Sequence, residues 1–205
     1  DADGGAVTPL TRDGKDDLRP RWSPDGETIA FTRGDIFLIA ADGSNARNLT
    51  SAPGHHADLA WSPDGRRIAF MWLRAEPGDW EIAVVDVTTR DTTRLTRHSA
   101  RDSHPVWSPD GERIAFESDR RGSRELFVVD AAGGGPPPLS TRHALAGGAA
   151  WSPDGRRIAF ASRAYGSDTG RATNKDDAKQ RRQDAARRRE QLRPLKKEME
   201  KLERA

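Results

Sequence analysis

The sequence predicts an all-β fold, an incomplete β-propeller of about three and a half to four four-stranded blades, followed by a charged C-terminal α-helical tail. The first observation is a repeated unit, because AWSPDGRRIAF occurs at residues 60–70 and again, unchanged, at residues 150–160. Two variants, RWSPDGETIAF and VWSPDGERIAF, begin at Arg21 and Val106. The tryptophans of these units are 39, 46 and 44 residues apart, which is the period of propeller blades.

Each unit also contains its own turn. Ser-Pro-Asp-Gly has the composition of a type I turn that ends at a glycine with positive φ, and the Ile-Ala-Phe after it alternates large and small residues with the period of a strand. We therefore assign the fold-determining role to the Trp, Asp and Gly of every unit: Trp22, Asp25, Gly26, Trp61, Asp64, Gly65, Trp107, Asp110, Gly111, Trp151, Asp154 and Gly155.

The tryptophans of the unit are expected to bridge adjacent blades. We expect Trp61, Ile68 and Phe70 to pack against the neighbouring blade, so that Trp61→Ala costs about 3 to 5 kcal/mol of stability. Trp72 and Trp80 lie outside the repeated unit. The sequence therefore predicts a smaller contribution from these two residues.

The second observation is that every period adds two further strand candidates. Apolar runs and Leu-Thr-like segments alternate along the chain: the runs begin at Asp35, Trp80 and Arg124, and the segments occupy 48–50, 94–96 and 138–140. Residues 9–11 form a similar segment near the N-terminus, ahead of the first unit. One period thus holds four short strands joined by Gly, Asp and Pro turns, which is the make-up of one blade.

The last period departs from the others. After Phe160 no strand of the Phe-Val-Val-Asp type follows, so we place the blades at 1–163, a linker at 164–174 and a charged helical tail at 175–205. Residues 171–205 carry 13 Lys and Arg against 7 Asp and Glu, whereas the rest of the chain has a net charge of −4. A solvated helix and a docking helix remain open for the tail. Nucleic-acid binding is disfavoured because acidic residues interrupt the basic run and no aromatic residue accompanies it.

WSPDG followed by xxIAF, an apolar strand that ends in Asp and an Arg-x-Leu-Thr segment resembles the TolB-like propeller repeat, also called the PD40 or WD40-like repeat. The resemblance covers residues 8–162. It also extends to the N-terminal propellers of prolyl-oligopeptidase (S9) family serine peptidases. A TolB-type chain implies a periplasmic or secreted location, and a peptidase-type chain implies a cytoplasmic one. A shared fold leaves the function open.

The residues do not predict catalysis by this chain. A serine hydrolase of the S9 class needs a Gly-x-Ser-x-Gly elbow, which the sequence lacks, so its hydrolase domain would lie beyond Ala205. No cofactor or metal is expected, because there is no cysteine, the calcium-loop pattern is incomplete, and the neighbouring His55 and His56 point to opposite faces of a strand. No run of 18 apolar residues predicts a membrane span.

Ligand contacts are expected just before each tryptophan, where the chain enters the innermost strand at the mouth of the propeller channel. These positions hold Arg19, Asp58 and His104, with Gly148 at the corresponding place in the last unit. They are either solvated loop residues or contacts to a peptide or protein segment. Our working hypothesis is a non-catalytic TolB-like module for protein or peptide binding.

Two alternatives stay open. The first is a truncated substrate-gating propeller of an S9 (acylaminoacyl or dipeptidyl aminopeptidase-like) peptidase whose catalytic domain is missing. The second is a self-assembling repeat unit, because an incomplete arc exposes unpaired edges that invite pairing with another chain. The segment at residues 8–11 is expected to supply one outer strand as a ring-closing clasp.

Overall fold

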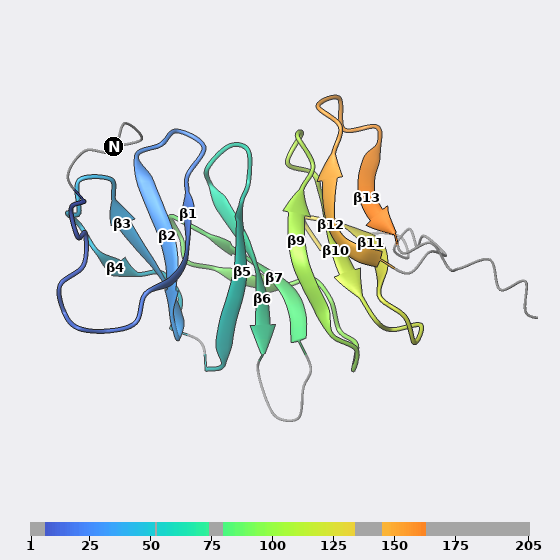
Figure 1. Cartoon of the computed structure of the whole chain (residues 1–205), viewed down its shortest axis with the longest axis horizontal. Helices are drawn as coiled ribbons and strands as arrows, with labels where there is room; N and C mark the ends of the chain where they lie inside the picture. The colour runs from blue at the N-terminus through green and yellow to red at the C-terminus, as the bar shows by residue number, and fades with distance from the viewer. Residues whose placement is uncertain (1–6, 52, 74–79, 134–144, 163–205) are drawn as a thin grey trace, which may run out of the picture. The chain divides into compact units, whose positions relative to one another are not determined.

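The protein is described here by a computed structural model that covers residues 7–51, 53–73, 80–133 and 145–162. All of them belong to the first of two compact units, Asp1–Arg163, the second being Ala164–Ala205. The described chain consists of β-strands and turns (Figure 1), as the sequence predicts. The predicted linker, helical tail and 138–140 segment lie outside the described residues. Within these ranges no helix is long and apolar enough to cross a membrane.

The strands follow one another as antiparallel meanders, one to each blade. Blade 1 is formed by β1 (Leu18–Trp22), β2 (Thr28–Arg33), β3 (Asp35–Ala40) and β4 (Arg47–Asn48). Blade 2 is formed by β5 (His55–Trp61), β6 (Arg67–Leu73), β7 (Trp80–Asp86) and β8 (Thr92–Arg94). Both sheets have their four strands in sequence order, which confirms the predicted four-stranded blade.

The later blades are shorter over the described residues. Blade 3 has three strands, β9 (Asp102–Trp107), β10 (Arg113–Ser118) and β11 (Glu125–Asp130). Blade 4 has the two inner strands, β12 (Leu145–Trp151) and β13 (Ile158–Ser162). These four successive antiparallel sheets agree with the predicted incomplete propeller.

The outermost strands begin and end earlier than predicted. We expected them at 48–50 and 94–96, but β4 and β8 have already ended when the Leu-Thr pair is reached. The reason is that this pair turns toward the core: Leu49 is 2% exposed, and the Thr50 hydroxyl accepts a hydrogen bond from the amide of Ile36 (2.9 Å). Thr96 accepts one from the amide of Ile82 in the same way (2.9 Å).

The Ser-Pro-Asp-Gly segments form hydrogen-bonded turns, as the sequence predicts. In the first, the Gly26 amide donates to the Ser23 carbonyl (3.0 Å) and Gly26 has a φ of 74°, a conformation that costs glycine little. The Ser23 hydroxyl donates to the Asp25 carboxylate (2.5 Å), which also accepts from the amide of Glu27 (3.0 Å). These bonds hold the pKa of Asp25 below its usual range, and the same pattern lowers the pKa of the other turn aspartates, Asp64, Asp110 and Asp154.

The Ile-Ala-Phe strands explain how one blade packs on the next. Ala30 of blade 1 lies in one core cluster with Ile68 and Phe70 of blade 2. Ala69 of blade 2 lies in the next cluster with Ile114 and Phe116 of blade 3. The large residues thus face the preceding blade and the small alanine leaves room for the following one, which confirms the expected packing of Ile68 and Phe70.

The tryptophan of each unit forms a second contact between blades, which we call the tryptophan joint. The indole of Trp61 donates to the Arg21 carbonyl of the preceding blade (3.0 Å). Trp107 and Trp151 donate in the same way to the carbonyls of Ala60 (2.9 Å) and Val106 (3.1 Å), again the residue before a tryptophan. An arginine of the preceding blade covers two of these rings, with Arg67 over Trp107 (4.7 Å) and Arg113 over Trp151 (4.8 Å).

Trp72 corrects the expectation that tryptophans outside the unit contribute less. Its side chain is 9% exposed and belongs to the same buried cluster as Phe70. The reason is that β6 continues past Phe70, which places Trp72 opposite His56 of β5, where the two rings stack at 6.1 Å. Its indole also donates to the Pro53 carbonyl (3.2 Å).

Candidate functional site

The site begins with an irregularity that recurs three residues before every tryptophan. Arg19, Asp58, His104 and Gly148 all occupy this position, and their φ angles are 55°, 50°, 53° and 63°. In each blade the pairing of the two inner strands shifts register at this point. The repeat therefore places a β-bulge with one left-handed residue in each inner strand, and such bulges redirect a side chain.

Arg19, Asp58 and His104 adopt a backbone conformation that is unfavourable for residues other than glycine. A left-handed backbone costs a residue other than glycine on the order of 1 to 3 kcal/mol, and such residues cluster at ligand sites. Gly148 adopts the same conformation without this cost, and the structure leaves open space where its Cβ would be. The backbone is thus constant around the repeat while the side chain differs in every blade.

The inner strands lie next to one another, so these side chains meet. The Arg19 guanidinium Nη1 donates to Asp58 Oδ1 across the first pair of blades (2.7 Å). His104 Nε2 lies 3.7 Å from Asp58 Oδ2 across the next pair. The sequence-predicted residues Arg19, Asp58 and His104 therefore form one continuous row across three blades, which we call the inner row.

Glu117 extends the inner row and was not predicted from the sequence. Its side chain is 2% exposed, and its Oε2 lies 3.4 Å from His104 Nδ1 and 3.5 Å from Arg124 Nη1. The Gly148 amide donates to its Oε1 (3.2 Å), which brings the fourth bulge into the same network. Glu117 Oε2 is buried and accepts no hydrogen bond within the described residues. The available signal was the acidic residue directly after Ile-Ala-Phe, which the other units replace with Thr, Met or Ala.

A cavity of about 520 Å3 opens beside the inner row. Its size falls in the range of small-ligand pockets, about 300 to 1,000 Å3. The wall is mainly apolar with a few polar groups from the bulges, and it consists of Arg21, Asp58, Leu59, Ala60, Trp61, Pro63, His104, Pro105, Val106, Trp107, Gly148 and Ala149. Asp58, His104 and Gly148 thus face one hollow, whereas Arg19 reaches it through Asp58.

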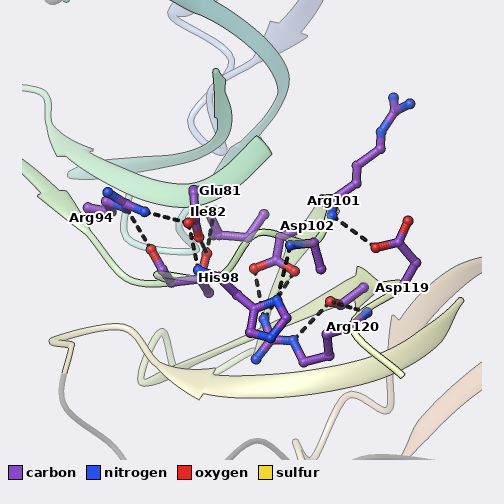
Figure 2. Close-up of polar contacts among 11 residues, drawn as sticks. Glu81, Ile82, Arg94, His98, Arg101, Asp102, Asp119 and Arg120 are labelled. Carbon is purple, nitrogen blue, oxygen red and sulfur yellow. Dashed lines mark hydrogen bonds and ion pairs between the residues drawn. The ribbon is translucent and has the colours of Figure 1, made fainter. Parts of the chain in front are cut away.

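A second polar cluster lies between blades 2 and 3, away from the bulges (Figure 2). Buried Glu81 accepts from the side chains of Arg94 and Thr96 and from the amide of His98 (2.7 Å). Asp102 is 0% exposed, and Arg120 Nη2 donates to both of its carboxylate oxygens (3.0 and 2.8 Å).

Burial raises the pKa of Asp102 because the charged form loses water, and the hydrogen bonds from Ser118, Thr96 and Arg120 oppose that rise. The carboxylates of Glu81 and Asp102 accept their hydrogen bonds from other groups of the protein. We therefore assign the cluster to the joining of blades and not to ligand binding.

The described residues offer little for a metal ion. Among them, no group of three or more His, Asp or Glu side chains has the arrangement to hold one. The adjacent histidines differ in their surroundings, since His55 is exposed and His56 is buried with its Nδ1 2.9 Å from the Gly34 carbonyl oxygen. Burial lowers the pKa of His56.

Comparison with known proteins shows the family to which the chain belongs. The sequence profile of the TolB beta propeller domain (PD40) matches residues 1–186. The solved structure of TolB from Acinetobacter baumannii is 30% identical with a TM-score of 0.61, and the match covers 77% of this chain and 40% of that one. A putative TolB from Agrobacterium tumefaciens is 27% identical with a TM-score of 0.59, over 69% and 52% of the two chains. The chain thus spans about half or less of these proteins.

Peptidases share the same fold. A puromycin-hydrolyzing peptidase of Mycobacterium tuberculosis is 19% identical with a TM-score of 0.55, over 70% of this chain and 27% of that one. In sequence, 56 residues are 43% identical to a protein of Bacillus subtilis described as "Uncharacterized peptidase YuxL", a stretch that is 24% of this chain and 8% of that protein.

Proposed function

Because the chain belongs to the TolB beta propeller domain family, we propose that it acts as a non-catalytic propeller module that binds a protein or peptide segment at the inner row. The observation that carries this proposal is the row itself: Arg19, Asp58 and His104 stand on left-handed backbone and lie within 3.7 Å of one another along the row. Strain of this kind, repeated beside a cavity, supports a binding role.

The chemistry of the cavity favours a peptide as the ligand. Trp61, Val106 and Trp107 give it an apolar wall that suits an apolar side chain, while Asp58 and His104 supply an acceptor and a donor at its rim. A peptide carries both kinds of group at short intervals. An apolar side chain fills the cavity in this arrangement, and the polar groups next to it exchange hydrogen bonds with the inner row.

The test is a selection of displayed random peptides on the full chain, followed by calorimetry of the tightest peptide. Arg19→Ala, Asp58→Ala and His104→Ala combined are expected to weaken binding about tenfold or more, because charged hydrogen bonds contribute about 1.5 to 3 kcal/mol each. A matched control combines His55→Ala, Arg90→Ala and Asp91→Ala, which changes the same residue types at exposed positions outside the cavity wall.

Two results would contradict the proposal. One is a selection that enriches no peptide. The other is a peptide whose affinity survives the substitutions in the inner row or falls equally in the control.

The stretch shared with the Bacillus subtilis peptidase supports a second candidate, a substrate-gating propeller of a serine peptidase. Its hydrolase domain would carry a Gly-x-Ser-x-Gly elbow and follow the propeller in the chain. Reading the genomic DNA past the codon for Ala205 tests this candidate. A continuing frame with that elbow supports it, and a stop codon at that point contradicts it.

A further inference from the structure

We propose that copies of this chain associate head to tail, with blade 4 of one copy docked on the Trp22 edge of the next so that Arg157 covers the Trp22 indole. This inference does not depend on the peptide-binding role of the inner row. It rests on the tryptophan joint, which recurs between the described blades and, among the described residues, is half-built at the outer edges of blades 1 and 4.

Within the chain, each complete tryptophan joint has the same two halves. The preceding blade supplies the carbonyl of the residue before its own tryptophan and an arginine six residues after it, and the following blade supplies its tryptophan. The arginine also donates to the glycine carbonyl of the following turn, as Arg67 does to Gly111 (2.9 Å) and Arg113 does to Gly155 (3.0 Å). A ring contact and a hydrogen bond thus recur together at both joints.

Blade 1 presents the tryptophan half of this joint without its partner. Trp22 is 58% exposed, whereas Trp107 is 7% exposed at the same place in its unit. Over the described residues, no guanidinium lies on the Trp22 ring and no carbonyl accepts from its indole. Leu18, on the same strand, is also 58% exposed. The edge of blade 1 therefore shows an apolar surface of the kind that is covered elsewhere in the protein.

Blade 4 presents the arginine half. Arg157 stands six residues after Trp151, as Arg67 stands after Trp61, and it is exposed, with its amide held by the Ser152 hydroxyl (2.9 Å). Ala159, the small residue that makes room for a following blade, is also exposed. The two ends thus present complementary groups, since Arg157 supplies a cation and Trp22 an exposed aromatic ring.

The N-terminal segment before β1 packs on blade 1 in the way that the end of one blade packs on the next. Leu10 packs against Ile29, Phe31 and Ile39 of blade 1, as Leu49 of blade 1 packs against the large residues of blade 2. Thr11 and Asp17 correspond to Thr96 and Asp102 two blades further on, and in both pairs the threonine hydroxyl acts to lower the pKa of the aspartate. Leu10 therefore occupies the place that Leu49 takes one blade further on, but residues 8–11 do not form the outer strand that the sequence predicts.

Among the described residues, no inner strands of another blade pack on the Trp22 edge of blade 1. The last blade supplies β12 and β13, which are the two inner strands of its own sheet. Because the two halves belong to different surfaces, the contact is heterologous, and it produces rings if the rotation closes and open chains if it does not.

Sedimentation velocity of the full chain over a range of concentrations tests the proposal. We expect the sedimentation coefficient to rise with concentration, and Trp22→Ala or Arg157→Glu to weaken the association about tenfold, as expected for loss of a partly desolvated cation–π contact. Arg156→Glu is the matched control, because it makes the same charge change at an exposed neighbour whose counterpart in blade 2, Arg66, does not take part in a joint. Unchanged far-ultraviolet circular dichroism shows that each variant is folded.

Mixing the two variants separates a heterologous contact from any other. Trp22→Ala keeps a functional Arg157 and Arg157→Glu keeps a functional Trp22. At a concentration at which each variant alone is monomeric, the mixture is therefore expected to form dimers and nothing larger. A wild-type chain that remains monomeric at its highest soluble concentration overturns the proposal. So does association that both variants retain, or a mixture that stays monomeric.

Discussion

Trp107 and Trp22 occupy the same place in the same repeated unit, yet their surroundings differ. Trp107 is 7% exposed, donates to the Ala60 carbonyl and lies under Arg67. Trp22 is 58% exposed at the edge of blade 1. The comparison shows that the tryptophan stabilises a pair of blades and not its own turn. The effect of each unit on stability therefore depends on whether another blade precedes it.

The largest expected effect comes from removing the two tryptophans in turn. Trp107→Ala should lower the free energy of unfolding by about 3 to 5 kcal/mol, because it empties a buried site and leaves a carbonyl without its donor. Trp22→Ala should change it by less than about 1 kcal/mol, because little of the side chain is buried. Urea denaturation at low protein concentration measures both. Equal losses would contradict the difference between closed and open joints.

Substitution of the arginines of blades 2 and 4 tests the same difference, with a smaller expected change in the free energy of unfolding. Arg67→Ala should cost about 1 to 2 kcal/mol, since it removes a contact with the Trp107 ring and a hydrogen bond to the Gly111 carbonyl. Arg157→Ala, at the equivalent place in blade 4, should leave the stability of the monomer unchanged within about 0.5 kcal/mol. Thermal unfolding of the two variants, measured side by side, checks this expectation.

His56 of blade 2 contacts the Gly34 carbonyl of blade 1, so the contribution of this contact between blades to stability can be tested by varying the pH. Burial lowers its pKa, so the unfolded chain takes up a proton near the ordinary histidine pKa of about 6.5 while the folded chain stays neutral until the pH is lower. Protonation then favours the unfolded state, and stability should fall as the pH drops below about 6.5. His56→Gln should flatten this fall, and exposed His55→Gln should not. The same slope in both variants would assign the effect to other groups.

The smallest expected effect on stability belongs to the inner row. Arg19 and Asp58 form a pair whose side chains are 51% and 21% exposed, and exposed pairs contribute about 0 to 1 kcal/mol. Arg19→Ala should therefore leave the unfolding free energy nearly unchanged. A loss similar to that of Trp107→Ala would show that the row holds the blades together and would weaken its assignment as a binding site.

The sequence predicts the parts of this fold that are local and repeated. The Ser-Pro-Asp-Gly turn needs only its own residues, and the spacing of the tryptophans sets the blade. The inner row was also within reach, because the position before each tryptophan can be counted along the chain. Its left-handed backbone was not, since only Gly148 among the four residues indicates a positive φ.

The features that the sequence did not reveal depend on contacts between residues far apart in the chain. Glu117 joins the inner row because β9 and β10 pair with a register shift beside His104. Trp72 is buried because it pairs with His56 of β5 and its ring stacks on the imidazole. The cluster around Glu81 and Asp102 likewise depends on contacts between blades 2 and 3, although Arg94 and Thr96 belong to a repeated segment.

Hydrogen exchange of the tryptophan indoles tests the tryptophan joint most directly. The full chain would be exchanged in heavy water at low concentration and the indole resonances assigned with single Trp→Phe variants. The account predicts that the indoles of Trp61, Trp107 and Trp151, each bonded to a carbonyl of the preceding blade, exchange slowly, and that the Trp22 indole exchanges fast. A Trp22 indole as protected as that of Trp107 in the dilute monomer would contradict it.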